Sequence, residues 1–192
     1  KSIEINNNDY VSKFELSKIF LSTKEYYKGL EFYEYRKKII INKNINILKN
    51  KFNSIEWNGQ KLDNKIILIL AEQGFGDIIL FKRFIDVLFK FDQVIFLCNE
   101  KLNYIFKESK FKIVNKIEDV GYHDFYQHLL TLPKIYFEKE NKFCKRINYL
   151  PNNHENDLKW KLKLNKLKKT KIGLAWQGNK NYLGDTKRSI PL

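Results

Sequence analysis

An aliphatic segment, a glycine turn, a helical pattern and a second aliphatic segment follow one another between residues 65 and 97. Residues 65–70 read Lys-Ile-Ile-Leu-Ile-Leu, which is typical of a strand buried on both faces of a parallel sheet. After Gly74-Phe75-Gly76, apolar residues recur at helical spacing over residues 77–89, and residues 94–97 predict the next strand. Because such a βαβ unit is right-handed and parallel, we predict an α/β fold: a doubly wound, Rossmann-like parallel sheet with flanking helices.

The segments on either side of this unit predict further elements. Residues 10–37 predict two amphipathic helices in an antiparallel hairpin, with Thr23 as the N-cap of the second helix. The apolar residues that set the helical spacing are Val11, Phe14, Ile19, Phe20, Tyr26, Leu30 and Tyr33. Weaker patterns predict a helix at 102–106, strands at 111–114 and 124–125, a basic helix at 157–169 and a strand at 171–176.

These elements divide the chain into four parts. We predict a helical segment at residues 1–38, an Asn- and Lys-rich linker at 39–64 with one anchoring aromatic in Trp57-Asn58-Gly59, and a Rossmann-like domain at 65–170. Residues 171–192 then provide the first strand and loop of a further domain. The sequence contains no Met and ends within Arg188-Ser189-Ile190-Pro191-Leu192, so we expect a piece of a longer protein.

The net charge of +14 favours anionic partners in principle. However, Lys, Asn and Ile are abundant along the whole chain, which is typical of an AT-rich coding sequence, and we expect no nucleic-acid partner. The alternative is a basic nucleic-acid binder that uses residues 159–171. We rank it last because Leu162, Leu164 and Leu167 are needed there for packing and no aromatic series is interleaved for base stacking.

Cysteine, histidine and hydropathy patterns narrow the class of protein further. Cys98 and Cys144 form no C-x-x-C motif, and the spacing of His123 and His128 fits no helical metal pair, so we expect no disulfide framework and no metal site. The longest apolar stretch, residues 66–71, is far shorter than the roughly 20 residues of a membrane span. We expect a cytoplasmic protein without a transmembrane segment.

Two glycine-containing loops could carry chemistry. The string Glu72-Gln73-Gly74-Phe75-Gly76-Asp77 follows a strand and opens a helix, where open α/β sheets bind ligands. It is not a dinucleotide fingerprint, since Ile79 replaces the third glycine, and it is not a phosphate-binding Walker loop. Asp77 is either the N-cap of the helix or a general base. The loop at residues 177–189 contains Gly, Asn, Lys, Arg and Ser, which suit a diphosphate.

Taken in order, these motifs resemble a bacterial family in which tetratricopeptide repeats precede a glycosyltransferase of the two-Rossmann (GT-B) fold, similar to heptosyltransferases and O-GlcNAc-transferase-like enzymes. The string Glu72 to Asp77 is the most specific part, and Tyr33-Glu34-Tyr35-Arg36 is similar to the end of the last repeat. The other matching motifs are Trp57-Asn58-Gly59, Phe81, Arg83-Phe84, Leu129-Leu130-Thr131-Leu132-Pro133, Gly173 to Trp176, Gly178-Asn179, Asp185 and Arg188-Ser189.

The resemblance implies the N-terminal half of an inverting, metal-independent glycosyltransferase that is inactive as this isolated chain. Asp77 would deprotonate the acceptor hydroxyl, and the substrates would be a nucleotide sugar and a glycan, lipid-glycan or protein acceptor, with no cofactor. The implied acceptor-binding residues are Glu72, Gln73, Gly74, Phe75, Gly76 and Arg83. The implied nucleotide-sugar-binding residues are Trp176, Gly178, Asn179, Asp185, Lys187, Arg188 and Ser189. The repeats would bind a protein partner, and the alternative is a non-catalytic, tetratricopeptide-linked interaction module.

Overall fold

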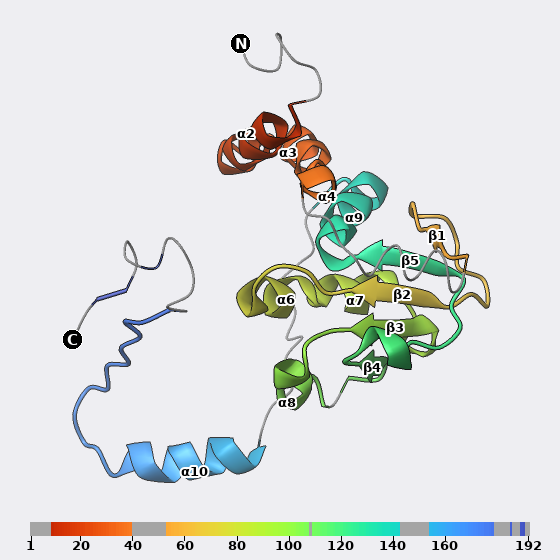
Figure 1. Ribbon diagram of the computed structural model, residues 1–192. Coiled ribbons are helices and arrows are strands. Elements are labelled where there is room, and N and C mark those ends of the chain that lie inside the picture. Colours follow the sequence, from red (N-terminus) through yellow and green to blue (C-terminus); the bar gives the residue numbers. More distant parts are fainter. Residues whose placement is uncertain are drawn as a thin grey trace. The chain divides into compact units, whose positions relative to one another are not determined.

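The computed structural model describes residues 9–39, 53–107, 109–142, 154–178, 185 and 189–190 (Figure 1). The chain divides into two compact units, residues 1–151 and residues 152–192. The first unit contains a parallel sheet flanked by helices, which confirms the predicted α/β class with a Rossmann-like sheet.

The sheet has five parallel strands in the order β1-β5-β2-β3-β4. Their bounds are Ile55–Glu56 for β1, Ile67–Leu70 for β2, Val94–Leu97 for β3, Lys112–Val114 for β4 and Phe125–His128 for β5. β2 lies at the centre, with β3 on one side and β5 on the other, and all four of its residues are buried. This position explains the uninterrupted aliphatic run that predicted the strand.

The strand order decides which connections cover which face. β2, β3 and β4 follow one another across the sheet, so right-handed connections place their helices on one face. These helices are α6 (Phe75–Phe81), α7 (Arg83–Leu88) and α8 (Asn103–Phe106), and α9 (Leu132–Glu140) joins the same apolar core. The chain then returns past β2 to β5, and this connection covers the opposite face with the short turn Ile117–Asp119 and Val120. Within the described residues the second face therefore has a turn where a doubly wound fold has helices.

The N-terminal part contains the predicted helix pair, α2 (Tyr10–Ser22) and α3 (Tyr26–Tyr33), followed by the short α4 (Arg36–Ile39). A Cβ on Gly29 of α3 would lie 2.7 Å from Leu21 Cδ2, so glycine permits the close approach of the two helices. Thr23 was predicted as the N-cap of α3, which is wrong. Thr23 is the C-cap of α2, because its hydroxyl bonds the carbonyls of Ile19 and Phe20 at the end of that helix, and Glu25 occupies the N-cap position of α3.

The buried side of α2 also differs from the predicted apolar stripe. Phe14 packs against Tyr33 and Phe20 packs against Phe32, as helical spacing predicts. Val11 and Ile19 are more than half exposed. The aromatic contacts with α3 determine which side of α2 faces inward, and aliphatic spacing alone could not.

The segment interpreted as a linker contributes to the sheet. Ile55–Glu56 pairs with β5 as the edge strand β1. Trp57 is 4% exposed, its ring centroid lies 4.9 Å from that of Phe89, and its Nε1 donates to Gln60 O at 2.8 Å. The aromatic anchor is thus as predicted, whereas a strand of two residues is too short to show a period in sequence.

The second unit contains α10 (His154–Asn165). It begins three residues before the predicted start at residue 157 and ends four residues before the predicted end at residue 169. Leu162, Leu164 and Leu167 were expected to pack but are 68%, 39% and 56% exposed. Lys and apolar residues alternate along 158–164, so successive apolar side chains lie about 200° apart around a helix and form no single face. The strand predicted at 171–176 is not formed, because a strand requires a hydrogen-bonded neighbour and the described part of this unit offers none.

Candidate functional site

The first glycine loop lies at the carboxyl edge of the sheet, the edge at which parallel α/β proteins bind ligands. β2 ends at Leu70 and α6 begins at Phe75, so residues 71–74 connect the two directly. Gly74 is the N-cap of α6, and its N–H donates to Asp77 Oδ2 at 3.3 Å. The interpretation of Asp77 as the N-cap residue is therefore wrong, because its carboxylate supports the cap from the third residue of the helix.

Glu72 is engaged by other parts of the protein. Arg36 Nη2 donates to Glu72 Oε1 at 2.6 Å, and Arg36 Nε donates to Oε2 at 3.3 Å. The backbone N–H of Leu130 also donates to Oε1, at 3.2 Å. Charge-assisted contacts of this bidentate kind are strong and geometrically specific. Glu72 therefore joins the helical segment to the residues that follow β2 and β5.

Arg36 is the centre of this joint, and its side chain is 0% exposed. It also donates to Glu34 Oε1 at 2.8 Å and to Thr131 Oγ1 at 2.9 Å. Burial opposes ionisation, but the charges of Arg36 and Lys37 hold the pKa of Glu34 below its ordinary value. Burial also lowers the pKa of Arg36, but the neighbouring carboxylates of Glu72 and Glu34 outweigh this effect and raise it above its ordinary value. The buried cation is thus compensated by two carboxylates, as a buried charge requires.

Gln73 is fixed by the same helical segment. Its backbone is in the left-handed region, with φ of 64°, which is uncommon for a residue with a side chain. Its Nε2 donates to the Tyr33 hydroxyl at 3.0 Å, and the Arg36 guanidinium carbon lies 4.8 Å from the Tyr33 ring centroid. The helical segment therefore holds the loop at two successive residues.

A cavity of about 390 Å³ opens beside the loop, at the carboxyl ends of β2, β3 and β4. Three predicted acceptor-binding residues line it, and they are Glu72, Gln73 and Phe75. The predicted residues Gly74, Gly76, Asp77 and Arg83 are not among its described lining residues. The remaining lining residues are Leu70, Ala71, Ile78, Leu97, Cys98, Asn99, Asn115 and Ile117.

Asn99 and Asn115 are polar lining residues that were not among the predicted site residues. Asn99 follows β3 by two residues and Asn115 follows β4 directly, so each stands after a predicted strand at the edge that Glu72 also occupies. Their position just after predicted strands could have indicated that both residues lie at this edge of the sheet. Cys98 also lines the cavity, and burial raises the pKa of its thiol to about 11, so the sulfur is neutral at physiological pH.

Arg83 is the first residue of α7, and its guanidinium carbon lies 5.3 Å from the ring centroid of Phe84. Its Nε is buried and has no hydrogen-bond partner within the described part of the chain. The structure thus shows an aromatic contact for Arg83 and does not place it in the cavity wall.

The second loop lies in the second unit. Hydrogen bonds connect three of its predicted nucleotide-sugar-binding residues directly and a fourth, Trp176, through Ile190. Gly178 N–H donates to Ser189 Oγ, and Ser189 Oγ donates to Asp185 Oδ1, both at 2.8 Å. The N–H of Ile190 donates to the carbonyl of Trp176 at 2.9 Å. The loop therefore closes upon itself. The other predicted residues, Asn179, Lys187 and Arg188, lie outside the described residues.

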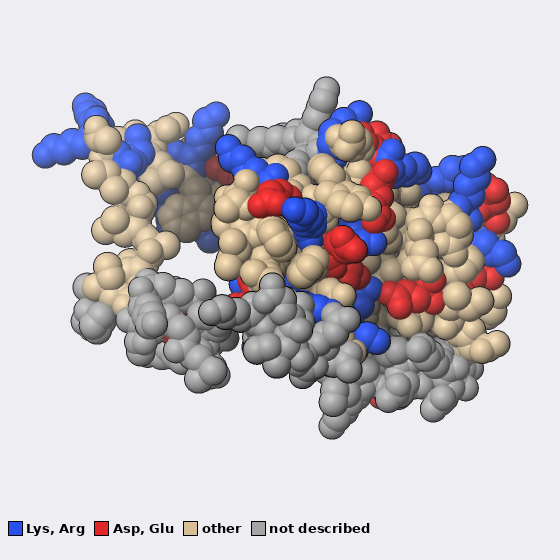
Figure 2. Space-filling model, turned by 90° about the horizontal axis from the view of Figure 1, so that it is seen from above, with Lys and Arg blue, Asp and Glu red and all other residues tan. Residues whose placement is uncertain are grey.

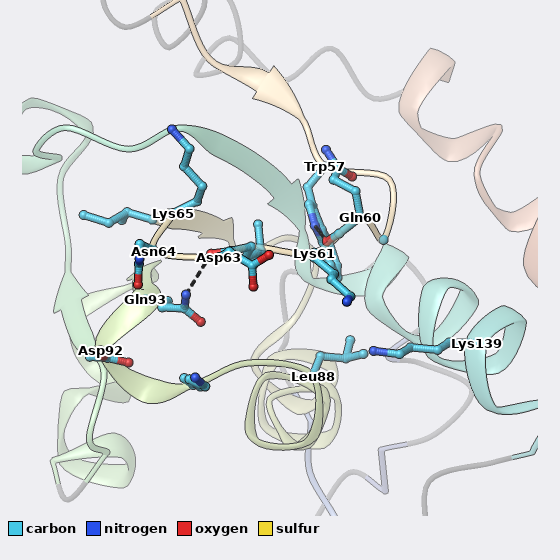
Figure 3. A pocket seen from close by; sticks show the side chains of 14 residues that line it. Trp57, Gln60, Lys61, Asp63, Asn64, Lys65, Leu88, Asp92, Gln93 and Lys139 are labelled. Carbon is cyan, nitrogen blue, oxygen red and sulfur yellow. Dashed lines mark hydrogen bonds between the residues drawn. The ribbon is translucent and has the colours of Figure 1, made fainter.

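A larger cavity, of about 620 Å³, lies at the opposite edge of the sheet (Figure 3). Its walls come from the residues that precede β2 and β3, including Trp57, Asp63 and Asp92, and from Lys139 of α9. Gln93 Nε2 donates to Leu62 O at 2.9 Å and joins two of these walls. The amino ends of parallel strands are not where α/β folds bind ligands, so size alone does not make this cavity the candidate site.

A third cavity, of about 520 Å³, is lined by β1, β5 and the helical segment, and His128 is part of its wall. Both ring nitrogens of His128 are buried without a hydrogen bond in the described residues, and Nδ1 lies 3.6 Å from Glu72 Oε2. His123 instead donates from Nδ1 to the carbonyl of Gly121 at 2.9 Å, while Nε2 accepts from Ser54 Oγ at 2.7 Å. Burial lowers the pKa of both histidines.

Acidification is therefore expected to destabilise the first unit. Unfolded histidine titrates near pH 6.5, so below this pH the unfolded state binds more protons than the folded state. The free energy of unfolding should fall as the pH drops through about 6.5 and level off below the folded pKa values. Urea unfolding at about pH 7.5 and about pH 5.5 measures this loss, and His128→Gln should reduce it. The same pH dependence in the variant would contradict a neutral, buried His128.

Comparison with known proteins gives no family for this chain. No protein-family model, no curated protein and no solved structure matches it. Within the described residues, no helix is long and apolar enough to cross a membrane. Nor do the described residues include a group of three or more His, Cys, Asp or Glu side chains placed to hold a metal ion.

Proposed function

We propose that this chain forms the acceptor-binding half of an inverting, metal-independent glycosyltransferase of the GT-B type. In this proposal the glycine loop at the carboxyl edge of the sheet forms the acceptor site, and the loop at residues 176–189 begins the nucleotide-sugar half. The helices α2 and α3 end a tetratricopeptide-like array, which binds a protein partner. The supporting framework is the parallel sheet, whose carboxyl edge carries both the loop and the cavity of about 390 Å³.

The observation that carries the proposal is the open space around the glycines of the loop. Apart from its chain neighbours and the backbone of its own helix, a Cβ on Gly76 would meet no heavy atom within 4 Å, and a Cβ on Gly74 would meet only Asp77 Oδ2, at 3.4 Å. Neither glycine has a positive φ. Packing and backbone conformation thus do not require glycine at these positions. A ligand that approaches the backbone does require it.

Gly76→Ala tests whether a ligand, and not packing or backbone conformation, requires glycine at this position. Glycine in a helix is less favourable than alanine by roughly 0.5–1 kcal/mol, so the variant should be as stable as the parent chain or more stable. Acceptor binding should weaken, because the new methyl group occupies the space of the ligand. Urea unfolding measures the stability of the variant, and titration with sugars measures its affinity for the acceptor. A stabilised variant with unchanged binding would remove the glycine from the acceptor site.

Asp77 is the general base in this mechanism. It lies in the first turn of α6 and is partly exposed, next to the loop that borders the cavity. One carboxylate oxygen, Oδ2, accepts from the backbone of Gly74 and fixes the side chain. The other oxygen can then accept a proton from an acceptor hydroxyl as that hydroxyl attacks the sugar, while the nucleotide diphosphate leaves from the opposite face.

The second candidate is a non-catalytic interaction module, and the Arg36 joint favours it. In open α/β sheets the reversal of strand order, here between β2 and β5, marks the usual ligand crevice. Arg36 bonds there to Glu72, and Leu130 donates to the same carboxylate. A crevice closed by the protein's own side chains is consistent with a Rossmann-like shell that supports a helical binding surface without turnover.

A donor screen tests the proposal against this alternative. The 192-residue chain and the same chain carried through its downstream reading frame are incubated with a panel of nucleotide sugars and hydroxyl acceptors. We expect the longer form to consume one donor and the shorter form to bind acceptor without turnover. If neither form consumes or binds any nucleotide sugar, the glycosyltransferase proposal fails and the interaction module becomes the better description.

A further inference from the structure

The cavity beside the glycine loop has an unusual lining for a protein of this charge. The chain has a net charge of +14, yet no described residue that lines this cavity is Lys, Arg or His. On the face seen in Figure 2, basic side chains are interspersed with acidic ones over much of the surface. The absence of cations from the cavity wall therefore does not reflect a shortage of cations in the protein.

The one ionisable carboxylate in the wall does not bring its cationic partner into the cavity. Glu72 lines the cavity, while Arg36, which neutralises Glu72, is fully buried and does not line it. A phosphate or carboxylate entering the cavity would lose water without gaining a cationic partner among the described lining residues, and Arg36 is already paired with Glu72. The uncompensated loss of water opposes the binding of an anion.

We propose that this cavity binds an uncharged, hydroxyl-bearing sugar unit of the acceptor and rejects phosphorylated or carboxylated sugars. This inference rests on the function proposed above and names the acceptor class of the same site. Gln73 Oε1 can accept from a sugar hydroxyl and Asn99 Nδ2 can donate to one, since neither atom bonds another described residue. Asn115 Nδ2 is already engaged, because it donates to Cys98 O and to Asn103 Oδ1. Phe75, which is 44% exposed, and Ile117 provide apolar surface for the CH groups of a sugar ring.

Matched sugars test the inference directly. The 192-residue chain is titrated by saturation-transfer NMR with the methyl glycosides of glucose, galactose and mannose, with their 6-phosphates and with the corresponding uronates. At about 0.01 M salt, where the Debye length is roughly 30 Å, long-range attraction by the net positive charge favours the anions. We expect at least one neutral glycoside to bind tenfold or more tightly than its two charged counterparts. A preference of that size must arise from the local lining.

A charge-insertion variant provides the control for location. Asn99→Lys places a cation at the wall, and Asn58→Lys makes the same change at an exposed position outside it. Phosphorylated sugars should gain about two- to fivefold in affinity with Asn99→Lys, the effect of one exposed ion pair, and should not gain with Asn58→Lys. Thermal melts confirm that both variants fold.

Two outcomes would overturn the inference. Tighter binding of a phosphorylated or carboxylated sugar would show an anionic acceptor, and glycosyl transfer in the donor screen would still stand. Failure of every sugar to bind would show that the cavity is not a sugar site. In that case the donor screen decides separately whether the chain supports transfer.

Discussion

Asp77→Asn is expected to lower the rate of sugar transfer by about 10²- to 10⁴-fold, the usual contribution of a general base. Asparagine keeps an oxygen that can accept from Gly74 N–H, so the start of α6 should be preserved. It cannot take up the proton of the attacking hydroxyl. The rate is measured with the donor identified by the screen, in the form of the chain that turns over, while binding of the acceptor should change little.

Asp63→Asn is the matched control for this variant. Asp63 is exposed and lines the cavity at the opposite edge of the sheet, so it undergoes the same chemical change away from the glycine loop. Its transfer rate should equal that of the parent chain. If Asp77→Asn transfers sugar at the parent rate with an unchanged melting temperature, Asp77 is not the base, and its role is limited to the contact with Gly74.

Arg36→Met should lower the free energy of unfolding of the first unit by about 3–5 kcal/mol, as expected when one partner of a buried ion pair is removed. Methionine keeps the apolar length of the side chain but leaves Glu72 without its guanidinium partner, and Glu34 then has Lys37 as its remaining cationic partner. The Thr131 hydroxyl also loses its donor. Urea unfolding followed by circular dichroism gives the change.

Lys18→Met provides the comparison on the surface. Lys18 pairs with Glu15 at 2.6 Å, but both side chains are more than half exposed, and such pairs contribute about 0–1 kcal/mol. A loss in Arg36→Met no larger than that of Lys18→Met would mean that Arg36 does not hold the helical segment on the sheet. If Arg36→Met proves too unstable to purify, Glu72→Gln tests the same contact with a smaller perturbation.

The central elements of the fold were predictable because their sequences carry local patterns. Residues 65–70 and 94–97 predicted β2 and β3 to within two residues, since strands buried on both faces need continuous apolar residues. The helical pattern over residues 77–89 predicted one helix, where the structure has the two successive helices α6 and α7. β1 was not predicted, because a strand of two residues forms only by pairing with β5.

The candidate site was predictable in position but not in the partners of its side chains. The strand, glycine turn and helix placed Glu72, Gln73 and Phe75 at the carboxyl edge, where they line the cavity. Nothing local to Glu72 indicates a partner 36 residues earlier in the sequence. The prediction of a strand at 171–176 was wrong because it depended on a local pattern of residues. A strand also needs hydrogen bonds to a neighbouring strand, which a local pattern does not reveal.

By itself, then, the sequence determined the α/β class, the central strands and the location of the glycine loop, because burial and backbone geometry act over a few residues. Only the tertiary structure decided that Glu72 is bound by Arg36, that Gly74 and not Asp77 is the N-cap of α6, and that Asn99 and Asn115 share one cavity with Gln73. Ion pairs and cavity walls bring together residues that are far apart in the chain. Which residues meet depends on the order of the strands in the sheet, and a local sequence pattern does not determine that order.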